Sequence, residues 1–226
     1  MGFKIRDFGK PIYDEYQEDP KRVIIISCEG SVTEPEYFNT VKVKLAEHLS
    51  DIIEIEVVDK QSNASEPKNV MANLQRYVET YDYRKEHDSL WLVCDREKVD
   101  ARKKHLQEIM PICKENGYKL AISNPLFELW LLMHITDISQ YDKTDLFANE
   151  PVNPRSRRSR RFIDKQLSNI LDNGYNKKSG RFNQDIVTYD NLLRAMEQEK
   201  TLENDEELLL DKLGCNIGEL INDILT

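Results

Sequence analysis

The 226-residue chain has little cysteine and no long hydrophobic run, and each shortage excludes a class of protein. Its four cysteines lie far apart and form no CxxC pair: Cys28, Cys94, Cys113 and Cys215. This spacing excludes a ribbon-type zinc site and gives no sign of a disulfide framework, so we expect a cytoplasmic protein. No apolar segment approaches the roughly 18 residues that a membrane span needs, and no apolar signal core begins the chain.

The chain also lacks an excess of positive charge. Its 41 Asp and Glu residues outnumber 32 Lys and Arg residues, which gives a net charge of −9. Such a protein does not bind polyanions indiscriminately. The charge is uneven, however: "DEYQED" (14–19) and "ENDEE" (203–207) are acidic, whereas "RSRRSRR" (155–161) is strongly basic. A nucleic-acid partner would therefore have to contact this local basic run.

Short β-branched segments alternate with helical patterns in the first part of the chain. Apolar runs predict buried strands at 22–27 and 89–95, an alternating pattern predicts a strand at 52–58, and a fourth strand is expected at 118–124. Helical spacing predicts helices at 33–49, 67–83, 99–117 and 125–135. This alternation predicts an α/β fold with a Rossmann-like core and a mainly parallel sheet. We expect a flexible N-terminal arm (1–20), that core (21–135) and a mostly helical C-terminal region (136–226) packing on it.

Local signals mark the helix ends. Thr33 followed by Glu36 has the spacing of a capping box, and Pro35 suits a first helical turn. The capping box by itself accounts for Glu36. Glu34 is either an acid that complements the helix dipole or part of a functional site. Gly117 is expected to close the third helix at the C′ position.

Acidic residues follow two of the predicted strands. Glu29 ends the first strand and Asp95 the third, with Glu97 two residues further on. In an open parallel sheet, ligands bind at the carboxyl ends of the strands, so these side chains are expected to share one edge. Crowded carboxylates repel each other unless a cation joins them, and hard oxygen ligands select Mg²⁺ or Mn²⁺. Glu29, Asp95 and Glu97 are therefore the candidate metal ligands.

The fourth strand leads to the same edge. Asn124 precedes Pro125, and its amide is expected to project over that edge. Glu128 lies one turn into an otherwise apolar helix, where an unpartnered carboxylate is costly. It is either an acid near the surface at a helix N-terminus or a group that supports the metal site.

Three segments together resemble the RloB-like proteins: "CEGSVTEPEYF" (28–38), "LVCDRE" (92–97) and "ISNPLFELWLLMH" (122–134). The resemblance covers about residues 22–135, and continues more weakly through "GYNKKSG" (174–180). It implies a Toprim-like fold in a bacterial restriction-linked, abortive-infection protein. It also implies that a first-strand glutamate and a third-strand DxD motif bind Mg²⁺ for phosphodiester chemistry. The matching residues are Glu29, Glu34, Asp95, Asn124 and Glu128, and Glu97 stands where the motif has its second aspartate.

Among the activities that such a fold implies, hydrolysis suits this chain best. A topoisomerase needs a further domain that carries a tyrosine nucleophile, and a primase normally brings a zinc module. We therefore expect a metal-dependent nuclease that acts in anti-phage defence. A cation from Lys98, Lys177, Lys178 or Arg181 is expected to stabilise the charge on the phosphate.

The basic run is the candidate nucleic-acid contact, since so many arginines in seven residues cannot all pair with neighbouring acids on a helix. Its members are Arg155, Arg157, Arg158, Arg160 and Arg161, and Lys177, Lys178 and Arg181 extend it. DNA and RNA both stay open as the partner. Two rival functions also stay open. One is a receiver-like phosphoacceptor with Ser123 after the fourth strand, and the other is a non-catalytic subunit beside a partner ATPase.

Overall fold

The fold is built on one twisted sheet. The computed structural model describes residues 22–48, 53–59, 66–81, 83–156 and 159–226. A five-stranded sheet has the order β2-β1-β3-β4-β5. The first four strands run parallel and the fifth antiparallel: β1 (Arg22–Cys28), β2 (Ile53–Val58), β3 (Ser89–Asp95), β4 (Lys119–Asn124) and β5 (Gly214–Cys215). The predicted α/β class with a mainly parallel sheet is confirmed.

Both faces of the central strands are buried, as their continuous β-branched sequence predicts. In β1, Ile24 and Ile26 pack in one hydrophobic cluster, while Val23 and Ile25 pack in a second. Successive side chains of a strand point to opposite faces, so the two clusters lie on the two sides of the sheet. The four predicted strands are each confirmed to within one residue at either end.

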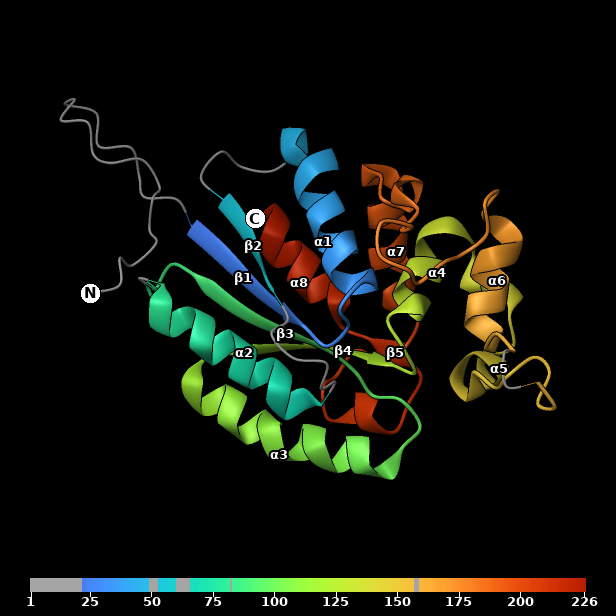
Figure 1. Ribbon diagram of the computed structural model, residues 1–226, viewed down its shortest axis with the longest axis horizontal. Coiled ribbons are helices and arrows are strands. Elements are labelled where there is room, and N and C mark those ends of the chain that lie inside the picture. The colour runs from blue at the N-terminus through green and yellow to red at the C-terminus, as the bar shows by residue number, and fades with distance from the viewer. Residues whose placement is uncertain (1–21, 49–52, 60–65, 82, 157–158) are drawn as a thin grey trace.

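Helices cover both faces (Figure 1). On one face lie α2 (Pro67–Thr80) and α3 (Asp100–Asn116), and on the other lie α1 (Thr33–Lys44) and α8 (Ile217–Leu225). Beyond the carboxyl ends of the strands lie α4 (Glu128–Ile135), α5 (Lys143–Ala148) and α6 (Phe162–Ile170). The remaining helical elements are α7 (Tyr189–Glu199) and the 3₁₀ turns η1 (Ala46–His48), η2 (Ile138–Gln140), η3 (Gln184–Ile186) and η4 (Leu208–Leu210).

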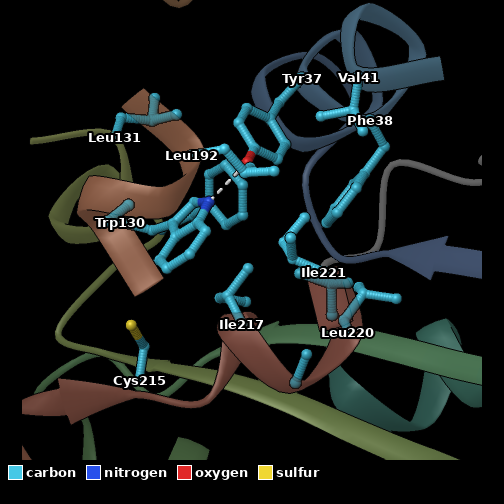
Figure 2. Packing of buried hydrophobic residues seen from close by; sticks show 14 of the residues in the cluster. Tyr37, Phe38, Val41, Trp130, Leu131, Leu192, Cys215, Ile217, Leu220 and Ile221 are labelled. Atoms are coloured by element: carbon cyan, nitrogen blue, oxygen red, sulfur yellow. Dashed lines mark hydrogen bonds between the residues drawn. The ribbon is translucent and has the colours of Figure 1, made fainter. Parts of the chain in front are cut away.

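The C-terminal region shares the core of the first part of the chain. Tyr37 and Phe38 of α1 pack with Trp130 of α4 and with Ile217 and Leu220 at the C-terminus (Figure 2). The indole nitrogen of Trp130 donates a hydrogen bond of 2.8 Å to the Tyr37 hydroxyl, drawn dashed in Figure 2. This packing joins residues that lie nearly 200 positions apart into one hydrophobic cluster, on the face opposite α2 and α3.

The last strand, β5, is an element that the sequence does not predict. It has only two residues, and the side chain of Asn216 continues its role by bonding to Ile122 N–H (2.6 Å) and Leu120 C=O (2.9 Å) of β4. A Cβ atom at Gly214 would lie 1.9 Å from the carbonyl oxygen of Glu203, so only glycine permits this close approach.

One expected helix cap is wrong. α1 begins at Thr33, its N-cap residue is Val32, and no side chain caps it. The Glu36 carboxylate instead accepts hydrogen bonds from Gly180 N–H (2.6 Å) and Phe182 N–H (3.2 Å). The Glu36 carboxylate, which the capping box would use as an acceptor at the helix start, is thus bound by the backbone of a distant loop. The expected cap at Gly117 is confirmed, with φ +72° in the left-handed region.

Two further expectations concern the chain as a whole. The N-terminal arm (1–20) lies outside the described residues. Within the described ranges, every helix is too short or too polar to cross a lipid bilayer.

Candidate functional site

Six carboxylates line one cleft at the carboxyl edge of the sheet. The cleft has a volume of about 580 Å³ and lies where β1 and β3 end and where α1 and α4 begin. We call it the acidic cleft, after the acidic side chains Glu29, Glu34, Asp95, Glu97, Glu128 and Asp164. The parallel register of β1 and β3 pairs Cys28 with Val93, and so brings the two strand ends to the same level. The expected shared edge is therefore present.

Glu29 lies on the floor of the cleft and is only 5% exposed. Its Oε2 atom accepts a hydrogen bond from the Asp95 N–H (3.1 Å), and its Oε1 atom lies 2.7 Å from Nη2 of Arg102. Burial raises the pKa of Glu29 to about 7, although Arg102 and the Asp95 N–H act in the opposite direction. Glu29 is thus a buried carboxylate that depends on a cation to stay charged.

Glu34, in the first turn of α1, turns back toward the strand end. Its Oε1 atom accepts a hydrogen bond from Gly30 N–H (3.1 Å). A Cβ atom at Gly30 would lie 1.9 Å from Oε2 of Glu34, so a larger residue would force this carboxylate away. Burial, followed by the nearby Glu128 carboxylate, raises the pKa of Glu34 to about 7. Glu34 therefore lies in the acidic cleft rather than on a solvated first turn.

Asp95 joins the floor of the cleft to α4. Its Oδ1 atom accepts a hydrogen bond from Phe127 N–H (2.8 Å), one residue before that helix. Burial raises the pKa of Asp95 well above its usual range, and the carboxylates of Glu34, Glu29 and Glu128 raise it further. Asp95 thus lies close enough to three other carboxylates of the cleft for their charges to act on it.

Glu97 is held in an uncommon backbone conformation, with φ +44°. Its N–H donates to Pro125 C=O (3.0 Å), and its carbonyl accepts from the guanidinium group of Arg96. Arg96 is itself buried and donates to Leu210 C=O in η4 (2.7 Å). These bonds direct the Glu97 side chain, 41% exposed, toward the mouth of the cleft. A non-glycine residue at such a φ is typical of a functional site.

Glu128 has the partners that its burial requires. The Tyr175 hydroxyl donates a hydrogen bond of 2.7 Å to Oε1 of Glu128, and the Lys177 ammonium lies 2.8 Å from the same atom. Lys177 also lies 3.2 Å from Oδ1 of Asp164 in α6. The loop that carries Tyr175 and Lys177 therefore closes one side of the acidic cleft. Of the two interpretations of Glu128, the solvated helix end does not match its burial.

Asn124 is not brought to the cleft with the other residues. Its side chain is buried and donates to Leu209 C=O (2.6 Å), so it faces η4 instead. Ser123 does not line the cleft either, because it is fully buried in β4, between β3 and β5. A buried serine does not suit the receiver-like interpretation, which needs this hydroxyl at the site.

The basic residues separate into two groups. Lys98, Arg161 and Lys177 line the acidic cleft. Arg155, Lys178 and Arg181 are exposed and do not line it, and Arg160 donates to Tyr175 C=O (2.9 Å). The expected contacts at Arg157 and Arg158 lie outside the described residues. Of the described residues in the expected basic surface, Arg161 and Lys177 therefore line the cleft.

Sequence reasoning missed four residues that shape the cleft: Arg96, Arg102, Asp164 and Tyr175. One of them carried a signal, because a basic residue in a first helical turn opposes the helix dipole and calls for an acidic partner. This signal applies to Arg102, near the start of α3. The other three act through contacts between segments far apart in the sequence, which no local pattern reveals.

The cleft suits a hard divalent cation in donor type and in charge. Carboxylate oxygens are the ligands that Mg²⁺ prefers, and a cation would offset both the burial and the repulsion that raise the pKa values of Glu29 and Asp95. In the arrangement described, however, no group of three or more His, Cys, Asp or Glu side chains converges as a ready metal site. The nearest cation to Glu29 is instead the protein's own, since Arg102 contacts this carboxylate.

Comparisons with known proteins agree with the resemblance carried by the cleft residues. The family model described as RloB-like protein matches residues 24–224. A search of curated proteins and a search of solved structures each gave no match. The family match extends beyond the sheet and includes the loop of Tyr175 and Lys177, as well as β5 and most of α8. Since it spans nearly the whole chain, the protein belongs to the family of RloB-like proteins.

Proposed function

We propose that this RloB-like protein is a metal-dependent nuclease that hydrolyses phosphodiester bonds, and that it acts in the bacterial cytoplasm in anti-phage defence. The observation that carries the proposal is the crowding of six carboxylates in one cleft, four of which have raised pKa values. Perturbed acids in a cleft are typical of functional sites. The defence role rests on the resemblance to restriction-linked, abortive-infection proteins.

Glu29, Asp95 and Glu97 are the residues that would hold Mg²⁺ or Mn²⁺. When bound, such a cation polarises a phosphoryl oxygen and activates water for attack. Glu34 and Glu128 lie close enough to Asp95 to raise its pKa, and so add negative charge around the proposed ligands. The chain thereby supplies the oxygen donors and the field that favour a divalent cation over a monovalent one.

The cations at the mouth of the cleft are suited to a nucleic-acid backbone. Lys98, Arg161 and Lys177 line the same cleft as the carboxylates. Positive side chains there would orient a phosphate above the acidic floor and stabilise the charge that develops on it. Lys177 is fixed by Glu128 and Asp164, whereas Lys98 lies over the ring of Phe147, 4.9 Å from its centroid.

The test combines cation binding with cleavage. Titration calorimetry with Mg²⁺ and Mn²⁺ should show binding to the wild type that Asp95→Asn abolishes. Cleavage of tRNA, mRNA, single-stranded DNA and duplex DNA should require the cation, and Asp95→Asn should lower its rate by about 10²-fold or more.

Glu108→Gln is the matched control, because it neutralises one exposed carboxylate that pairs with Lys68, outside the cleft. This variant should bind the cation and cleave as the wild type does. Equal cleavage by the wild type and Asp95→Asn would refute the assignment of the cleft.

A second function has one observation in its favour. Because the described carboxylates do not converge as a ready metal site, the chain alone would be inactive if a partner must first rearrange them. This is the non-catalytic subunit, or the subunit activated by a partner ATPase. Cation binding without cleavage by the isolated protein, with cleavage restored by addition of a partner ATPase, would favour this alternative.

A further inference from the structure

One guanidinium group lies between two of the proposed metal ligands. Nη2 of Arg102 is 2.7 Å from Oε1 of Glu29 and 3.9 Å from Oε2 of Glu97. The Arg102 side chain is only 12% exposed, so solvent screens these contacts weakly. A single nitrogen atom thus serves as the cation for one carboxylate of the cleft floor and one at its mouth.

The position of Arg102 in the fold is unfavourable without these acids. It lies in the first turn of α3, which begins at Asp100, and the positive end of a helix dipole repels a basic side chain there. The strained backbone of Glu97, held by Arg96 and Pro125, brings the second carboxylate within reach. The unfavourable helix position of Arg102 and the backbone conformation of Glu97 therefore both favour contact between this cation and the acids.

We propose that Arg102 is the resident counter-cation of the acidic cleft, and that a divalent cation must displace its guanidinium group from Glu29 in order to bind. This inference rests on the proposed metal site at Glu29, Asp95 and Glu97. An atom within hydrogen-bond distance of Oε1 of Glu29 competes with a cation for that oxygen. The two positive charges would also repel each other strongly in a partly buried site. Arg102 thus holds the affinity for the divalent cation below the value that the carboxylates alone would give.

This arrangement accounts for a cleft that keeps its buried carboxylates close together before any divalent cation arrives. The Arg102 guanidinium group lies 2.7 Å from Oε1 of Glu29 and so supplies this buried carboxylate with a counter-charge. Arg102 acts as a positioning residue through the two glutamates.

The decisive experiment measures cation affinity and needs no cleavage assay. Mg²⁺ and Mn²⁺ are titrated by calorimetry into the wild type, Arg102→Gln and Arg102→Lys, after circular dichroism and melting have established that each variant is folded. Arg102→Gln should bind the cation about tenfold more tightly, because a full positive charge leaves the site. Arg102→Lys keeps the charge on a shorter, rotatable side chain and should increase the affinity by less.

Lys98→Gln is the matched control. Lys98 lines the same cleft and its replacement removes the same charge, but its ammonium lies over Phe147. This variant should change the affinity for the divalent cation less than about threefold, because the Lys98 ammonium lies over Phe147 rather than against a proposed metal ligand. If Lys98→Gln increased the cation affinity as much as Arg102→Gln, the effect would come from the overall charge of the cleft and not from the contact of Arg102 with Glu29. That result would overturn the inference.

Two further outcomes separate this inference from the proposed function. If Asp95→Asn abolishes binding while Arg102→Gln binds equally or more weakly, the metal site stands and the counter-cation role fails. If no variant binds either cation, the metal site fails and the inference falls with it.

Discussion

Two of the places where the described residues bury carboxylates have different surroundings. In the acidic cleft, Glu29 and Glu34 have pKa values raised to about 7. At the end of α7, burial raises the pKa of Glu199 to about 7 as well. Burial alone therefore does not distinguish a functional acid from a structural one. The distinction lies in the groups that surround each acid.

Glu199 is satisfied by neutral donors. Gly218 N–H donates to both of its oxygens, at 3.0 and 3.1 Å, and the Cys215 thiol lies 3.2 Å from Oε1. These bonds tie the end of α7 to β5 and to the first turn of α8. In the cleft, by contrast, the carboxylates line a shared cavity. Burial raises the pKa of Asp95, and Glu34, Glu29 and Glu128 raise it further. A lone buried acid with its own donors cross-links the fold, whereas a crowded set beside a cavity is suited to a cation.

The largest expected effect tests this difference through stability. Glu199→Ala leaves the Gly218 N–H buried without an acceptor and should lower the free energy of unfolding by about 2–3 kcal/mol. Asp95→Asn removes one of several mutually repelling charges and should leave that free energy unchanged or raise it slightly. Urea denaturation at pH 7.5, without divalent cations, measures both. If Asp95→Asn proves as destabilising as Glu199→Ala, the cleft carboxylates are structural cross-links too.

The comparison also explains what the sequence predicts and what it does not. The four long strands follow from local patterns, which are apolar runs in β1 and β3 and an alternation in β2. The ends of β1 and β3 place Glu29 and Asp95 at one edge by topology alone. The two-residue β5 is too short to produce a pattern, since its pairing depends on Asn216 and on the approach of Glu203 to Gly214. Local periodicity predicts elements, but not contacts between distant segments.

The same limit appears within the site. Glu36 has the spacing of a capping box, yet its carboxylate accepts from Gly180 and Phe182, which lie more than 140 residues away. Asn124 is at a strand end like Asp95, but η4 supplies a carbonyl that captures its amide. In both cases the residue type was informative and the direction of the side chain was not, because a distant backbone group decided it.

The pH dependence of stability should differ between the two places. The folded pKa of Glu34 is about 7, above its ordinary value of 4.5, so between these values the folded state binds more protons than the unfolded one. Stability must then fall as the pH rises through this window. Glu34→Gln removes this contribution and should gain about 1–2 kcal/mol relative to the wild type between pH 5 and pH 8.

Glu199→Gln is the matched variant, because Glu199 titrates in the same window. Saturating Mg²⁺ at pH 8 should reduce the difference between Glu34→Gln and the wild type, since a bound cation relieves the charge that Glu34 bears. It should leave the difference at Glu199→Gln unchanged. Thermal melting from pH 5 to pH 8, with and without Mg²⁺, gives both differences. If Mg²⁺ changed the stability difference equally for Glu34→Gln and Glu199→Gln, the acidic cleft and the Glu199 site would not differ in cation binding.

The smallest expected effect concerns the cations beside each carboxylate. Arg161 lines the acidic cleft, whereas Lys200 lies next to Glu199 and pairs with the exposed Glu197. If the cleft binds a nucleic-acid backbone, Arg161→Ala should reduce the slope of log affinity against log salt by about 0.7–0.9. Lys200→Ala removes the same charge and should leave the slope unchanged. Fluorescence anisotropy with single-stranded and duplex oligonucleotides, from 50 to 200 mM salt, resolves a change of this size. Equal slopes for all three proteins would place nucleic-acid binding away from the cleft, and would leave its acids without the substrate that their crowding suits.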